Sequence, residues 1–120
     1  LETYAAELAA VHATRDDVYR LWENHEKLCA VEEQYALEAF SKLDLQFHTS
    51  IAIASHNLAI RRIIPVIEEA FTMRSNWKAA IGADTIRVHR DILEAIERKD
   101  PIGAKNNMIA HLVNSGSFVE

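Results

Sequence analysis

Residues 40–51 read FSKLDLQFHTSI, and this stretch indicates the fold that the rest of the sequence supports. Its large apolar residues recur every three or four positions, which is the spacing of one helix face. They are Phe40, Leu43, Phe47 and Ile51. Asp44 and His48 fall inside this stripe, four positions apart, so both should lie on one face, one turn from each other. A carboxylate inside an apolar stripe is costly to bury unless it is paired or bound to a metal.

The helical period continues along the chain, and no segment alternates as a strand would. We expect six helices, over residues 1–13, 15–33, 36–54, 58–81, 85–99 and 101–117. Only three Gly and two Pro occur, which suits helices, and 49% of residues are hydrophobic. A chain of 120 residues can bury one core. The sequence therefore predicts a single all-α domain over residues 1–120, folded as an antiparallel bundle.

Polar residues mark the expected helix ends. N-caps are expected at Thr14, in a capping box with Asp17, and at Asn57, Asp84 and Asp100. Pro101 follows the last of these at the first helical position, where proline is favoured. Pro65 should kink the fourth helix, and Gly82 should end it. Gln34-Tyr35-Ala36 separates the second and third helices, although it contains neither Gly nor Pro.

Charge and composition exclude several classes of protein. The net charge is −5 and the sequence contains no dense basic stripe, so the chain is a poor candidate for binding nucleic acid through its own surface. No apolar run is long enough to span a membrane. The single cysteine, Cys29, cannot form an internal disulfide, and nothing indicates secretion. A cytoplasmic location is therefore expected.

Two further histidines lie on apolar helix faces. His89 shares a face with Ile86 and Leu93, and His111 follows Met108 on the last helix. Together with Asp44 and His48, they would give three imidazoles and one carboxylate, a donor set that suits a divalent transition metal. The alternative is that each is a hydrogen-bonded or ion-paired core residue. Spacing does not show whether the helices meet, so both interpretations stay open here.

Three other residues are candidates for binding an effector. Arg74 lies on an apolar row of the fourth helix, where its guanidinium could meet an anionic ligand or its stem could pack while its head reaches water. Asn107 is one turn before His111 and could line the same cavity. His25 lies on the apolar row of the second helix, where a structural role is the alternative.

No sequence motif of an enzyme is present. The chain has no HExxH, GxSxG, P-loop or GxGxxG pattern. Asp44 is the one acidic residue expected near the histidines, so its ligation of a metal would leave no obvious general base. A small metalloenzyme is therefore less favoured than a binding domain.

Two motifs resemble a known family. The first is Asp44-x-x-Phe47-His48 followed by Ile51-Ala52-x-Ala54-Ser55-x-Asn57, and the second is His89-x-x-Ile92-Leu93-x-Ala95-Ile96 followed by Asp100, Ala104, Met108 and His111-Leu112. Both resemble the FCD domain, the C-terminal effector-binding half of the FadR subfamily of GntR-type transcriptional regulators. His56 departs from the pattern, because the family often has glycine there.

The resemblance implies a function. In metal-binding FCD domains, the positions of Asp44, His48, His89 and His111 are the ligands, the metal is typically zinc or nickel, and small organic acids bind beside it. Family members act as homodimers and bind operator DNA through an N-terminal winged helix-turn-helix, which this sequence lacks. We therefore expect a ligand-sensing regulatory domain. A small metalloenzyme and a metal-free helical dimerisation module are the alternatives.

Overall fold

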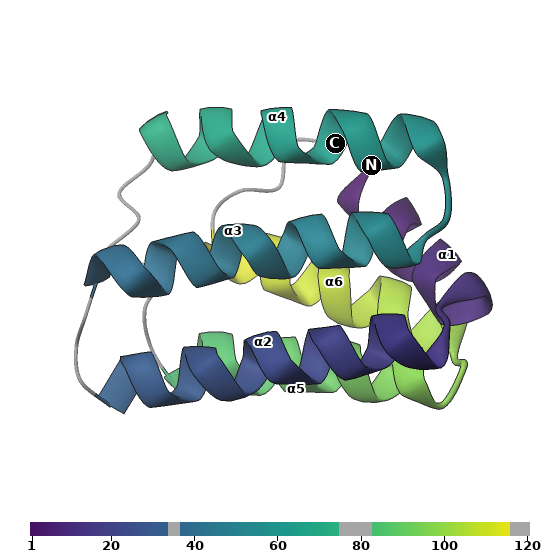
Figure 1. Cartoon of the computed structure of the whole chain (residues 1–120), viewed down its shortest axis with the longest axis horizontal. Coiled ribbons are helices and arrows are strands. Elements are labelled where there is room, and N and C mark those ends of the chain that lie inside the picture. Colours follow the sequence, from purple (N-terminus) through teal and green to yellow (C-terminus); the bar gives the residue numbers. More distant parts are fainter. Residues whose placement is uncertain (34–36, 75–82, 116–120) are drawn as a thin grey trace.

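The computed structural model describes the backbone of residues 1–33, 37–74 and 83–115 and the side chains of residues 1–31, 38–70 and 85–113. These residues form six α-helices and no strand, which confirms the all-α fold. The helices are α1 (Glu2–His12), α2 (Arg15–Glu33), α3 (Leu37–Ala54), α4 (Leu58–Arg74), α5 (Ala83–Glu97) and α6 (Pro101–Ser115). They pack as a bundle in which α1 contacts α3, α5 and α6, and α4 lies at one edge beside α3 (Figure 1). None of the described helices has the length and apolarity needed to cross a membrane.

The start of α2 and the corner between α3 and α4 are tied together. The capping box is confirmed, since the Thr14 N–H donates to Asp17 Oδ2 at 2.9 Å and the Asp17 N–H donates to Thr14 Oγ1 at 3.1 Å. His56 has φ 55°, a left-handed conformation that glycine adopts more easily. Its Nε2 lies 2.7 Å from Asp17 Oδ2. Burial opposes ionisation of Asp17, but the hydrogen bonds from Thr14 and the contact with His56 lower its pKa.

Two further N-caps are confirmed. Asn57 Oδ1 accepts the Ile60 N–H at 3.1 Å, and Asp100 Oδ1 accepts the Gly103 N–H at 3.0 Å. Each side chain satisfies a backbone N–H that has no partner within its own helix. The short connections before α4 and α6 therefore fix where these helices begin.

Other predicted boundaries were wrong. Asp84 does not precede α5, because the helix begins at Ala83 and includes it. The same helix ends at Glu97 and not at residue 99, since Lys99 has φ 60° and the Asp100 N–H donates to the Ala95 carbonyl at 2.8 Å, closing a Schellman motif. The predicted breaks at 34–36 and at Gly82 lie outside the described residues.

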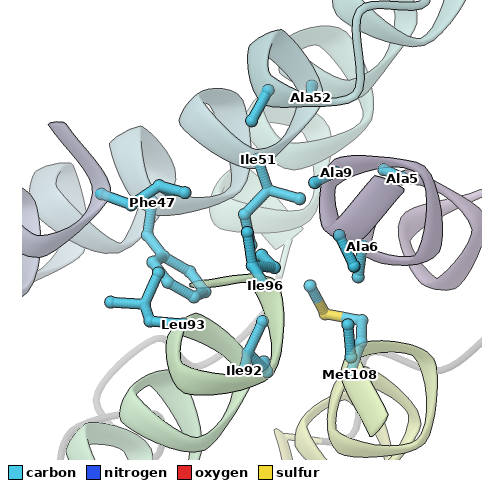
Figure 2. Packing of buried hydrophobic residues seen from close by; sticks show 14 of the residues in the cluster. Ala5, Ala6, Ala9, Phe47, Ile51, Ala52, Ile92, Leu93, Ile96 and Met108 are labelled. Carbon is cyan, nitrogen blue, oxygen red and sulfur yellow. The ribbon is translucent and has the colours of Figure 1, made fainter. Parts of the chain in front are cut away.

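The core is built on small residues of α1 and large residues of α3, α5 and α6. The buried face of α1 consists of Ala5, Ala6, Ala9 and Ala10. Leu1 and Leu8 pack against this core from its margin, whereas Val11 is 53% exposed. Figure 2 shows Phe47 and Ile51 of α3 packed with Ile92, Leu93 and Ile96 of α5 and Met108 of α6. Alanines let α1 approach these larger side chains closely.

α4 buries only part of its apolar surface. Ile60 and Ile64 are buried in the main cluster. Ile63 and Ile67 share the helical spacing of these residues but are 46% and 42% exposed. The apolar residues of α4 are therefore spread over more of its circumference than α3 can cover.

Candidate metal centre

Asp44, His48, His89 and His111 converge on one point inside the bundle. Each offers one ligand atom, and the four atoms lie within 4.8 Å of one another. Asp44 Oδ1 is 3.1 Å from His89 Nε2 and 3.9 Å from His48 Nε2. His48 Nε2 is 3.2 Å from His111 Nε2. Helices α3, α5 and α6 thus bring together residues up to 67 positions apart in the sequence.

The three imidazoles are buried in apolar surroundings. His48, His89 and His111 are 3%, 0% and 6% exposed, whereas the Asp44 side chain is 24% exposed. Phe47 stacks on His89 with ring centroids 3.8 Å apart and an interplanar angle of 7°. This packing fixes the His89 ring while leaving its nitrogens at the edge. Asp44 therefore stands on the side of the cluster nearest to solvent.

Several of these polar atoms make no well-aligned hydrogen bond among the described residues, namely Asp44 Oδ1, His48 Nδ1 and both nitrogens of His89. Their nearest polar neighbours are each other and Glu2, with Asp44 Oδ1 3.1 Å from His89 Nε2 and Glu2 Oε2 3.4 Å from His48 Nδ1. Leaving a buried polar atom unsatisfied costs about 1–3 kcal/mol. Ligand atoms about 2.0–2.1 Å from a tetrahedral zinc are about 3.3–3.4 Å apart, close to the shorter separations here. The four residues therefore fit a divalent transition metal in spacing and in donor chemistry.

Burial and the neighbouring charges shift the pKa values of His89, His111 and Asp44. Burial lowers the pKa of His111, and so do the nearby charges of His48 and His89. Burial also lowers the pKa of His89, although Asp44 partly opposes the shift. Burial alone would raise the pKa of Asp44, but the three histidines hold it well below its usual range. Two neutral imidazoles beside an ionised carboxylate are in the protonation states that metal binding requires.

Two carboxylates that the sequence analysis missed face the other side of His48. Glu2 Oε2 of α1 lies 3.4 Å from His48 Nδ1, and Glu68 Oε1 of α4 lies 3.3 Å from it. Both glutamates are buried, at 7% and 8% exposure. Burial alone would lower the pKa of His48, but Glu2 and Asp44 raise it to about 8. An Nδ1–H donated to a carboxylate leaves Nε2 available as a metal ligand.

A signal for these two glutamates exists in the sequence. Glu2 precedes the buried Ala5 and Ala6 by three and four positions, and Glu68 follows Ile64 by four. Each therefore interrupts an apolar row in the way that Asp44 does.

The remaining candidates are not among the four converging residues. Buried His25 meets Trp22 edge to face, with ring centroids 5.6 Å apart, and its Nε2 lies 3.7 Å from Cys29 Sγ. Burial lowers its pKa, and so does the charge of nearby His89. Asn107 Nδ2 donates to the Asp91 carbonyl at 3.2 Å. The side chain of Arg74 lies outside the described residues.

An open groove of about 340 Å³ lies between α2 and α3. Its lining includes Arg20, Asn24, Lys27 and Thr49. None of the four candidate ligands lines it, so the groove is separate from the candidate metal centre.

Comparisons with known proteins identify the family to which this fold belongs. A family model described as the FCD domain matches residues 1–114. The chain is 36% identical to the Exu regulon transcriptional regulator of Escherichia coli K12, covering 96% of this chain and 46% of that protein. It is 30% identical to the Uxu operon transcriptional regulator of the same strain, covering 95% and 48%. The chain therefore spans about half the length of these curated relatives.

A solved structure supports the same assignment. The Streptococcus agalactiae GntR superposes with a TM-score of 0.82 at 27% identity, covering 94% of this chain and 51% of that one. The two Escherichia coli relatives are transcriptional regulators and not enzymes. With a family model that matches nearly its whole length, the chain belongs to the FCD domain family of GntR-type transcriptional regulators.

Proposed function

We propose that this chain is the sensing domain of a transcriptional regulator, in which Asp44, His48, His89 and His111 hold one divalent transition metal. The observation that carries the proposal is the convergence of four ligand atoms within 4.8 Å at a buried point. The unsatisfied atoms of Asp44 and His89 support it, because a metal would satisfy them at once.

The buried charges also favour a cation at this position. Asp44, Glu2 and Glu68 place three carboxylates around the cluster, and His48 is the histidine whose pKa is raised. Three imidazole nitrogens and one carboxylate oxygen suit zinc or nickel, and such ligands disfavour magnesium or calcium, which prefer oxygen donors. Zinc or nickel is therefore the proposed metal.

A small organic acid is the proposed effector. When bound, the metal would supply a Lewis-acidic centre for a carboxylate, provided that its coordination expands beyond four. Asp44 lies on the more exposed side of the cluster, which favours approach of a ligand from there. Arg74, Asn107 and His25 stay candidates for contacting the rest of such a ligand.

Control of transcription requires more than this chain. We propose that it acts in the cytoplasm as a homodimer and reaches operator DNA through a separate winged helix-turn-helix domain. The net charge of −5 supports this arrangement, because an acidic sensing domain is not suited to bind DNA itself. An effector would then act by binding one arrangement of the helices better than another.

Metal analysis of the purified chain tests the central claim. We expect one zinc or nickel per chain by mass spectrometry of the metal content, and loss of that metal in His89→Ala and in His111→Ala. His12→Ala is the matched control, because His12 is an exposed histidine at the end of α1. A wild-type chain that neither carries nor takes up stoichiometric metal would favour the metal-free dimerisation module instead.

Calorimetric titration tests the effector. A panel of small hydroxy and sugar acids is titrated into metal-loaded and chelated chain. We expect heat of binding for one member of the panel only when the metal is present. Equal binding to both forms would contradict a metal-anchored carboxylate while leaving the metal site itself intact.

A further inference from the structure

α4 is attached to the bundle differently in its two halves. The helix lies beside α3 at one edge of the bundle (Figure 1). Its first half is anchored by Ile60 and Ile64, which are buried in the hydrophobic core. Pro65 follows inside the helix and has no N–H to donate to the Arg61 carbonyl, so one backbone hydrogen bond between the halves is missing. We call residues 66–74 the second half of α4, and its attachment depends on its own contacts.

The second half of α4 is anchored by a carboxylate. Its described side chains are those of residues 66–70, and among them Glu68 is the buried one, at 8% exposure. Val66, Ile67 and Glu69 are exposed. A buried carboxylate favours the folded position of its helix only when a positive charge or a hydrogen-bond donor faces it. The groups around Glu68 therefore determine how firmly this half is held.

An imidazole of the candidate metal centre faces Glu68. Glu68 Oε1 lies 3.3 Å from His48 Nδ1, and Glu2 Oε2 of α1 lies 3.4 Å from the same nitrogen. Nδ1 carries at most one hydrogen, so the two carboxylates share a single donor. The nitrogen makes no well-aligned hydrogen bond among the described residues. The positive charge on or near the ring therefore matters more for both carboxylates than the direction of one hydrogen bond.

The contact between Glu68 and His48 should be stronger when His48 holds a metal. The candidate ligand atom of His48 is Nε2, which faces Asp44 and His111, whereas Nδ1 faces the glutamates. Ligation through Nε2 fixes the ring and leaves Nδ1–H to donate to a carboxylate. It also brings the charge of a divalent cation close to Glu68 in a buried region, where charges interact more strongly than in water.

We propose that Glu68 is a positioning residue, through which a metal held at His48 keeps the second half of α4 docked on the bundle. The proposal rests on the metal of the proposed function and adds the helix that responds to it. Because coupling between two sites is reciprocal, the docked helix must raise the affinity for metal by the same factor. α4 would then report whether the centre is occupied.

Amide hydrogen exchange of the chelated and the zinc-loaded chain tests the proposal. Global stabilisation by zinc slows exchange in both halves of α4, so the quantity to compare is the slowing of residues 66–74 relative to residues 58–65. We expect zinc to slow exchange in the second half about tenfold more than in the first. Equal slowing of both halves by bound zinc would overturn the proposal and leave the metal site standing. A chain that binds no zinc would overturn the proposed function as well.

Glu68→Leu distinguishes positioning by charge from simple packing. Leucine would extend the apolar row of Ile60 and Ile64 and hold the second half of α4 without a charge, so the extra slowing by zinc should disappear. Glu68→Gln keeps an acceptor for His48 Nδ1 but loses the charge, so it should retain only part of the response. Glu69→Leu is the matched control, because Glu69 is an exposed glutamate on the same helix. A full wild-type response in either Glu68 variant would overturn the role of its charge.

The affinity for zinc gives a second readout, which packing alone would not change. We expect Glu68→Leu to weaken zinc binding about tenfold, because the coupling is reciprocal. Glu69→Leu should bind zinc as the wild type does. Competition with a chromophoric chelator measures the three dissociation constants. Equal affinities in wild type, Glu68→Leu and Glu69→Leu would show that α4 is not coupled to the metal.

Discussion

The bundle interior and the outer face of α4 break the usual rule of burial in opposite directions. The interior encloses three histidines and two glutamates at 8% exposure or less, with Asp44 beside them, whereas α4 exposes Val66 at 66%. Each arrangement is unfavourable for an isolated chain, because one leaves buried polar atoms unsatisfied and the other leaves apolar surface in water. A partner of matching chemistry would relieve either arrangement, and for the interior the proposed partner is a metal.

The two regions should also differ in what they depend on. The candidate metal centre draws on α1, α3, α4, α5 and α6, so it couples to the stability of the whole fold. The exposed face of α4 involves one helix, so altering it should leave the fold intact. Experiments on the interior should therefore have the larger effects on stability.

Among the changes considered, adding metal should have the largest effect on the stability of the chain. Adding a small excess of zinc to chelated protein should raise the melting temperature by about 10 °C or more, because a ligand that binds only the folded state at 1,000 times its Kd adds about 4 kcal/mol. Thermal unfolding followed by circular dichroism measures the shift. Magnesium is the control ion and should give no shift, whereas equal shifts with both ions would contradict a nitrogen-rich site.

Replacing His89 should distinguish its contribution to the stability of the fold from its contribution to metal binding. His89 is fully buried and stacks on Phe47, and its nitrogens make no well-aligned hydrogen bond among the described residues. His89→Leu removes these poorly satisfied atoms, but it also removes the imidazole nitrogen that lies 3.1 Å from Asp44 Oδ1 and helps to lower the pKa of that carboxylate. We expect the two effects to offset each other, so that the chelated variant stays within about 1 kcal/mol of wild type while zinc no longer stabilises it. Urea unfolding with and without zinc measures both.

A large loss of stability in chelated His89→Leu would contradict this account. It would mean that the imidazole makes a structural contribution without metal, as in a hydrogen-bonded core histidine. Phe47→Leu is a useful comparison, because it removes the stacked ring but leaves all four ligands in place.

Sequence pattern marks the four candidate ligands but cannot tell the buried face of α4 from its exposed face, and the reason is physical. Asp44, His48, His89 and His111 each interrupt an apolar row, which made them candidates for a shared partner, although spacing did not show that their helices meet. Ile63 and Ile67 do not break any pattern in the sequence, because apolar residues lie around most of the circumference of α4. Periodicity cannot distinguish a helix buried on all sides from one with a second, exposed apolar face. The long-range contact of Glu2 with His48 also depends on packing that no local pattern reports.

Removing Glu2 should weaken metal binding without removing a ligand. Its carboxylate lies 3.4 Å from His48 Nδ1 and would orient the ring so that Nε2 faces the metal. We expect Glu2→Leu to weaken zinc affinity about 10–100-fold, as loss of such outer partners typically does. Glu2→Gln keeps a hydrogen-bond acceptor and should retain more of the affinity. Competition with a chromophoric chelator measures the dissociation constants.

Glu97→Leu is the control for the two Glu2 variants, because Glu97 is an exposed glutamate on α5. Cobalt-substituted protein adds a spectroscopic test, since a reoriented His48 would change the visible absorption of the bound cobalt. Identical affinities and spectra in the Glu2 variants and wild type would show that Glu2 does not position His48.

The smallest effect is the pH dependence of the chelated chain, which should be most stable near pH 6.5. The pKa of His48 is raised to about 8 in the folded state, so its stabilisation is fully present below pH 6.5 and is lost as the pH rises through 8. The pKa values of His89 and His111 are lowered on folding, so these residues destabilise the fold as the pH falls below 6.5. Stability should therefore decline on both sides, by about 2 kcal/mol on the alkaline side.

Bound metal should reverse the loss of stability that the chelated chain shows above pH 6.5. A metal on Nε2 displaces the proton that His48 holds in the chelated chain, so metal affinity should increase as the pH rises from 6.5 to 8. Urea unfolding across this range should thus show falling stability in chelator and rising stability in zinc. In His48→Gln the decline in chelator should disappear, while the acidic decline caused by His89 and His111 remains. Parallel profiles with and without zinc would mean that the metal does not bind at His48, because no proton would then be exchanged for it.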